Sequence, residues 1–331
     1  MNSHLLSIIR IDRISVHRSE LMGIGILGVM LGHYLEWSQA SGFWTYILKP
    51  FIGLVFTEGF LILSGFGLYY SFSNNSEFFS FYKKRFDRLV VPFWLLSVPY
   101  VFWLLFKGQT MGNILLHLSA LDFWINGNTG MWYISVTILL YFLFPFLYSL
   151  LFKSGRLKVL LFIMTLFVLY MLPFVLCLYT PNYYEATYLG YTQIPMFLWG
   201  LGLGYMAYNG IHFKRDFLCL ALLFCVVLFL KMQDGVFSQF GNGFQRLLYI
   251  LILPSILDLS FVSKIFSTIL KWFGTLSLEL YVLHLTLHRV FITDRGGGGT
   301  SALLSILVAL VLAPVFHVFI SWLQHSLLVR K

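Results

Sequence analysis

Two histidines lie deep inside long apolar stretches of the sequence. His33 ends the glycine-rich run SELMGIGILGVMLGH, and His284 ends a second run, FGTLSLELYVLH. Each lies twelve residues after the expected start of its apolar segment, at Leu21 and Trp272, which is about 18 Å along a helix. We therefore expect the two imidazoles at similar depth. A buried imidazole can take a proton from a hydroxyl group, or it can merely bridge two helices by hydrogen bonding.

Acidic side chains accompany the two histidines. Glu58 lies within a second long apolar stretch, and Glu279 precedes His284 by five residues with Tyr281 between them. We expect Glu58 or Glu279 to orient the imidazole of His33 or to stabilise its protonated form. An ionisable group inside a membrane span is costly, so the set predicts a polar cavity within the membrane. His284 is interpreted either as a second acid or base or as a structural partner of His33.

A basic cluster, YKKRFDRLVVP, occupies residues 82–92. Arg85 and Arg88 are three positions apart, so on a helix they share one face. Planar guanidinium groups bind phosphate oxygens through paired hydrogen bonds, which predicts a phosphate clamp at the membrane rim. The alternative is the ordinary excess of basic residues on the inner side of a membrane.

The composition predicts that membrane helices carry these residues. The chain of 331 residues is 59% hydrophobic and 11% charged, with a mean hydropathy of +0.83, whereas soluble domains carry about 25% charged residues. We expect one all-α domain over residues 1–331, a polytopic bundle of about ten transmembrane helices in a lipid bilayer. The ten candidate spans are the apolar runs 20–37, 48–72, 89–106, 131–152, 157–178, 193–208, 217–231, 246–259, 272–292 and 301–325.

The distribution of positive charge predicts the orientation of the bundle. Sixteen of the 22 lysines and arginines fall in segments on one side, which favours cytoplasmic positions for both termini in an inner, cytoplasmic membrane. The net charge of +9 then reflects topology and calls for no nucleic-acid partner. The three cysteines have no metal-ligand spacing, so no metal is expected.

Three connections on the outer side are distinctive. Residues 107–130 contain NILLHLSALDFW, which predicts a short interfacial or re-entrant helix. Residues 179–192 are rich in tyrosine, and residues 294–300 form a glycine-rich link. Within the first span, Gly28 and Gly32 are four apart, and we interpret them as sites of close helix packing.

Five segments together resemble, in order, the motifs of the membrane acyltransferase-3 family, which O-acylates bacterial glycans. ELMGIGILGVMLGH resembles the opening helix that ends in the family's catalytic histidine, here His33. EGFLILSGFGLY resembles its acidic–FF–x–LSGF motif, and FYKKRFDRLVVP its R–x–x–R–x–x–P motif. MWYISVTILLYFLFP and FGTLSLELYVLH resemble its W–[FY]–[IL]–S and G–x–x–S–x–x–x–Y–x–x–H segments.

The resemblance implies transfer of an acyl group, with acetyl as the expected group, from acyl-CoA to a hydroxyl of a carbohydrate acceptor. His33 is then the general base, and Arg85 and Arg88 hold the phosphates of CoA at the cytoplasmic mouth. Two other classes remain open on the residues alone. A polysaccharide exporter or proton-coupled carrier would use His33, Glu58 and His284 as a proton relay, and a membrane scaffold would have no chemistry of its own.

Several further positions are expected to contact the substrates. Ser64 lies in a Ser–Gly break of the second span, where it either stabilises an oxyanion or marks a packing kink. The carbohydrate is expected to meet Trp132 and Tyr133 on the outer side, and Tyr281 and Glu279 are assigned to substrate binding as well.

The sequence departs from the family pattern at one position of the first span. The family has arginine or lysine eleven positions before its histidine, where this chain has Met22. Arg18 lies one turn further along the same helical stripe as Met22 and His33. We therefore expect Arg18, reaching from the inner rim, to take over part of the contact with the acyl donor.

Overall fold

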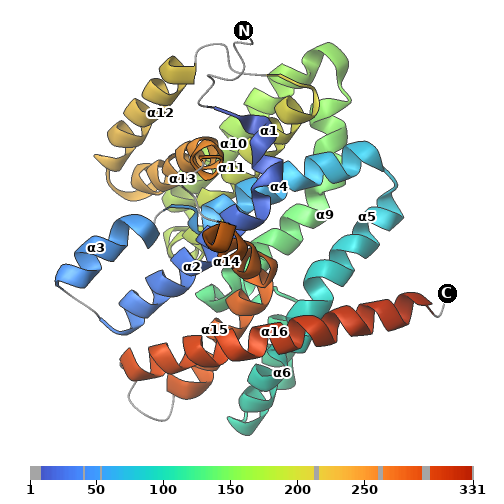
Figure 1. Cartoon of the computed structure of the whole chain (residues 1–331), viewed down its shortest axis with the longest axis vertical. Coiled ribbons are helices and arrows are strands. Elements are labelled where there is room, and N and C mark those ends of the chain that lie inside the picture. The colour runs from blue at the N-terminus through green and yellow to red at the C-terminus, as the bar shows by residue number, and fades with distance from the viewer. Residues whose placement is uncertain are drawn as a thin grey trace.

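The computed structural model describes residues 9–39, 42–52, 54–211, 216–259, 264–292 and 299–329. In these ranges every regular element is a helix, which agrees with the all-α prediction (Figure 1). The helices are α1 (Ile11–Val16), α2 (Arg18–Trp37), α3 (Phe43–Ile52), α4 (Phe56–Asn74), α5 (Phe78–Arg85), α6 (Val91–Phe106), α7 (Met111–Leu118), α8 (Asp122–Asn126), α9 (Trp132–Phe152), α10 (Lys158–Tyr179), α11 (Pro181–Tyr208), α12 (Asp216–Lys231), α13 (Gly235–Leu257), α14 (Lys264–Thr275), α15 (Ser277–Ile292) and α16 (Gly299–Val329).

Long apolar helices make this a multi-pass membrane protein. Five helical segments of the described chain are long and apolar enough to cross a bilayer. The first of them joins α5, a π-helical turn η2 (Phe86–Val90) and α6 into one continuous segment. The five segments are Phe78–Phe106, Thr129–Phe152, Gly155–Tyr179, Gly235–Leu257 and Gly299–Ser326. The total of ten spans and the position of the termini stay predictions.

Several boundaries differ from those that the apolar runs predict. The run 48–72 is two helices, because α3 ends at Ile52 and α4 begins at Phe56. The run 272–292 is likewise divided between α14 and α15. The stretch 179–192 is not a connection: a proline in the first turn, which has a backbone suited to helix starts, opens α11 there.

The other two connections have different outcomes. The helix expected within 107–130 is present as α7 and α8, with a left-handed Gly127 ending α8 at a φ of 69°. Most of the predicted link at 294–300 lies outside the described residues.

Glycines set the closest contacts between the helices that carry the site. A Cβ on Gly28 would lie 2.9 Å from the carbonyl oxygen of Ile52, so α3 can pack on α2 only without a side chain there. A Cβ on Gly65 would overlap the carbonyl oxygen of Phe197, which brings α4 against α11. The packing interpretation of the glycines is confirmed at these contacts. The expected Ser–Gly break is wrong, because α4 runs through Ser64 and Gly65 without interruption.

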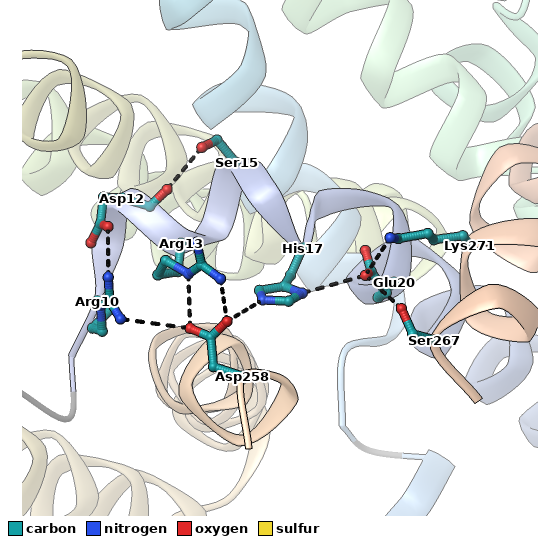
Figure 2. A network of polar contacts seen from close by, with 9 residues as sticks. All are labelled: Arg10, Asp12, Arg13, Ser15, His17, Glu20, Asp258, Ser267 and Lys271. Atoms are coloured by element: carbon teal, nitrogen blue, oxygen red, sulfur yellow. Dashed lines mark hydrogen bonds and ion pairs between the residues drawn. The ribbon is translucent and has the colours of Figure 1, made fainter. Parts of the chain in front are cut away.

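A polar network ties α1 and the start of α2 to the end of α13 and to α14 (Figure 2). The carboxylate of Asp258, which follows α13, accepts both guanidinium hydrogen bonds of Arg13 and lies 2.9 Å from Nε2 of His17. The other ring nitrogen of His17 lies 3.4 Å from Glu20, which also pairs with Lys271 of α14 at 3.3 Å. Because α2 carries His33, this network helps to fix the helix that positions the site.

Candidate active site

The two histidines singled out by their depth meet in the structure. His33 comes from α2 and His284 from α15, and Nδ1 of the first lies 2.9 Å from Nε2 of the second. His284 is fully buried, whereas His33 is half-buried. The prediction that the two imidazoles share one depth is confirmed.

The hydrogen bonds of His284 define the proton positions of the pair. Nδ1 of His284 lies 2.6 Å from the carbonyl oxygen of Leu280, which can only accept, so this nitrogen carries the hydrogen. In a neutral ring Nε2 of His284 is then bare and accepts from Nδ1 of His33. Nε2 of neutral His33 is left with a free lone pair, which is the state that a general base requires.

Neither expected carboxylate orients His33. Glu58 lies in the first turn of α4, where it faces Arg246 of α13 with 4.0 Å between the carboxylate and Nε. Glu279 points to α16, and its carboxylate lies 2.7 Å from Nδ1 of His317. The expectation is therefore wrong. Spacing along the chain predicts the depth of a side chain but not the helix that it faces, and these two carboxylates face other helices. A histidine holds the orienting position instead.

A cavity of about 200 Å³ is lined by residues of the same helices and by three arginines, and neither histidine of the pair lines it; we call it the arginine cavity. Arg88 is exposed at its mouth, so the cavity opens at the protein surface. Three cationic forks in one small space are suited to phosphate groups. The side chains that line it include Arg18, Met22, Ser64, Arg85, Arg88, Tyr133 and Tyr281.

Arg18 and Met22 line the arginine cavity together, one helical turn apart on α2. Nε of Arg18 donates to the carbonyl oxygen of Leu63 at 3.4 Å. Gly67 of α4 makes room for the guanidinium group, since a Cβ there would lie 3.2 Å from Nε of Arg18. Arg18 and Met22 therefore lie on one stripe of α2, as expected, whereas contact of Arg18 with an acyl donor stays a prediction.

The end of α5 and the π-helical turn that follows it present the other two arginines. Nη2 of Arg85 donates to the hydroxyl of Ser71 at 2.9 Å, and its guanidinium carbon lies 5.9 Å from the ring centre of Tyr141. Arg88 lies in η2 and makes no hydrogen bond or ion pair within the described chain. Within the π turn, the carbonyl oxygen of Asp87 accepts a hydrogen bond from the side-chain amide of Gln324 on α16. Such turns often mark functional sites, and the sequence pattern did not reveal this one.

The comparison with known families decides the class of the protein. The model of the Acyl_transf_3 acyltransferase domain matches residues 21–323. The chain belongs to the acyltransferase-3 family. No curated protein and no solved structure matches it. The family match covers the histidine pair and every residue that lines the arginine cavity except Arg18, which lies three residues before it.

Tyrosines connect the two parts of this acyltransferase-3 site. Tyr281 lines the arginine cavity, and its ring centre lies 5.9 Å from that of His284, three residues later on α15. Tyr133 packs against Tyr281 with 5.3 Å between ring centres. Tyr281 therefore connects the lining of the cavity with His284.

Trp132 and Tyr133, both expected to meet the carbohydrate on the outer side, do not share one surface, and their contact with a carbohydrate stays a prediction. Consecutive helix residues point about 100° apart, so the two rings lie on different faces of α9. Tyr133 faces the arginine cavity, whereas Trp132 is buried against Phe123 with 6.4 Å between ring centres.

Two further rings that lie beside the histidine pair were not predicted from the sequence. Trp37 stacks on His33 with 4.9 Å between ring centres and on His288 with 3.3 Å. Both additions lie four residues after a predicted histidine, Trp37 after His33 and His288 after His284. Helical spacing could have found them. In the described residues no group of three or more His, Cys, Asp and Glu side chains is placed to hold a metal ion.

Proposed function

We propose that this acyltransferase moves an acetyl group from acetyl-CoA to a hydroxyl of a cell-surface or exported carbohydrate, as a multi-pass protein of the cytoplasmic membrane. The observation that carries the proposal is a histidine pair, His33 oriented by His284, that Tyr281 connects with a cavity lined by three arginines. A carrier has no evident need for a phosphate clamp beside its proton relay.

The donor enters through the arginine cavity. Arg88 at the mouth and Arg85 and Arg18 further in bind the phosphates of CoA, and the pantetheine arm extends toward Tyr281. The hydroxyl of Ser64 lines the same cavity and donates to the thioester oxygen as negative charge develops on it.

The histidine pair carries out the proton transfer. Nε2 of His33 takes the proton from the acceptor hydroxyl as the hydroxyl oxygen attacks the carbonyl carbon of the thioester. The carbon–oxygen bond forms, the carbon–sulfur bond breaks, and the CoA thiolate leaves and takes the proton from the imidazolium of His33. His284 acts as a positioning residue that holds His33 in the tautomer with Nε2 free.

Purified protein in detergent tests the proposal with radiolabelled acetyl-CoA and carbohydrate extracted from the source organism and deacylated with mild alkali. We expect label in the carbohydrate, loss of that label in His33→Asn, and full transfer in His325→Asn, a matched change of an exposed histidine on α16. Equal transfer by His33→Asn and the wild type would refute the role of His33. Substrate flux into vesicles without any label transfer would support a carrier instead.

A further inference from the structure

A second pocket lies at the opposite end of the bundle from the arginine cavity. It has a volume of about 320 Å³ and is formed where the end of α6 meets α7 and α8; we call it the outer pocket. The π turn that holds Arg88 directly precedes α6, and the pocket residues Tyr100 and Trp103 lie in the last two turns of that helix. The 16 residues of α6 cover about 24 Å, which separates the two openings.

The outer pocket combines flat aromatic surface with neutral hydrogen-bonding groups. Tyr100 and Trp103 stack at 5.5 Å and 16° on one side. Asn113, Asp122 and Asn128 contribute amide and carboxylate groups on the other. Small-ligand sites have this mixture of aromatic lining and a few oriented polar groups. A sugar ring matches it, because its C–H face stacks on an aromatic ring while its hydroxyls both donate and accept hydrogen bonds.

Two buried polar atoms at this pocket lack a partner in the described chain. Nε1 of Trp103 and Nε2 of His117 make no hydrogen bond, although His117 is only 4% exposed. Burial, together with the nearby charge of Arg289, lowers the pKa of His117 to about 4, so its ring is neutral at neutral pH. Buried polar groups are normally satisfied, so this pair points to a ligand with hydroxyl groups.

Asp122, which lines the outer pocket, and Arg289, which lines the narrower pocket next to it, both form hydrogen bonds with neighbouring side chains. Asp122 accepts from Asn126 at 2.8 Å and from Asn128 at 2.6 Å. Arg289 donates to Tyr100 at 3.1 Å and to Asn128 at 2.7 Å. One carboxylate and one guanidinium, each held by neutral partners, favour a neutral sugar over an anionic or cationic ligand.

The outer pocket continues inward toward the histidine pair. His117, Asp122 and Asn128 also line a narrower pocket that ends at Arg289. Arg289 follows His288 on α15, and His288 stacks on Trp37, which stacks on His33. On the same helix Tyr281 lines the arginine cavity, eight residues or about 12 Å before Arg289. The helix α15 therefore carries the histidine pair's His284 between a residue of the arginine cavity, Tyr281, and a residue next to the outer pocket, Arg289.

We propose that the outer pocket binds one neutral sugar ring of the acceptor, which stacks on Trp103 and donates and accepts hydrogen bonds at His117, Asp122 and Asn128. This inference rests on the proposed function for its substrate class. It assigns the acceptor to α6, α7 and α8 rather than to Trp132 and Tyr133.

Kinetics with the deacylated carbohydrate of the source organism test the pocket. We expect Trp103→Ala to raise the KM for the carbohydrate about tenfold, the loss of one ring-stacking contact. The KM for acetyl-CoA stays unchanged, because Trp103 does not line the arginine cavity. Trp103→Phe keeps a stacking face and restores most of the affinity. Phe102→Ala changes an exposed neighbour that does not line the pocket, and it behaves as the wild type. An unchanged carbohydrate KM in Trp103→Ala would overturn the proposal.

A binding measurement separates failure of this proposal from failure of the proposed function. Equilibrium dialysis uses the same carbohydrate, tritiated at its reducing ends, with the purified wild type, Trp103→Ala and His117→Asn. Binding by the wild type that weakens in both variants supports the pocket even when no acetyl group is transferred. Absence of binding by the wild type, or equal binding by all three proteins, overturns the pocket whatever the transfer assay shows.

Discussion

Replacing His284 tests the central feature of the proposed mechanism, the choice of tautomer at His33. His284→Phe keeps an aromatic ring in the buried space but removes the acceptor for Nδ1 of His33. His284→Gln keeps a side-chain oxygen that can accept that hydrogen. The two variants therefore differ chiefly in whether the imidazole of His33 is held with Nε2 free.

The size of the effect follows from the bond that is lost. An unpaired buried N–H costs about 1–3 kcal/mol, and His33 can avoid this cost by moving its proton to Nε2, which abolishes its use as a base. Since His33 is half-buried and water can replace part of the bond, we take the lower part of that range. About 1.4 kcal/mol corresponds to a tenfold fall in kcat. His284→Gln should retain most of the wild-type kcat.

The assay is steady-state transfer of labelled acetyl groups, with kcat and both KM values measured for each variant. We expect the KM for acetyl-CoA to be unchanged in both, because the arginine cavity is not altered. The unfolding temperature in detergent provides the control for a general loss of structure. A kcat for His284→Phe within twofold of the wild type would refute the tautomer argument.

Three more predictions concern the donor cavity, the helix contacts and the polar network. Arg18→Ala should raise the KM for acetyl-CoA about tenfold, and adding Met22→Arg on the same stripe should restore it; full activity of Arg18→Ala alone would contradict this. Gly65→Ala should lower the unfolding temperature, since overpacking a backbone contact costs about 1–3 kcal/mol. The control, Gly112→Ala on the exposed face of α7, should not lower it. Equal unfolding temperatures of the two variants would contradict the close contact at Gly65. The arginine pairing lowers the pKa of Asp258 to about 2, so its stabilisation is present above the unfolded pKa of about 4 and is lost as the pH falls toward 2. The difference in unfolding temperature between the wild type and Asp258→Asn should therefore be largest above pH 5 and narrow on acidification, and a difference independent of pH would rule this out.

Much of this protein could be predicted from its sequence. Composition determines an all-helical membrane fold, because a chain with so few charged residues must satisfy its backbone within helices in lipid. The rise per residue determines depth, so equal spacing placed His33 and His284 at one level. The three-residue spacing of Arg85 and Arg88 likewise predicted that they share one face, and both line the arginine cavity.

Only the tertiary structure decided which side chains meet. Depth says nothing about the direction in which a helix face points, so Glu58 and Glu279 lie against other helices and a histidine orients His33. The outer pocket joins residues from three helices, and no period within one helix could have revealed it. Packing between distant segments sets these directions, because side chains must interlock at contacts such as that of Gly65 with α11.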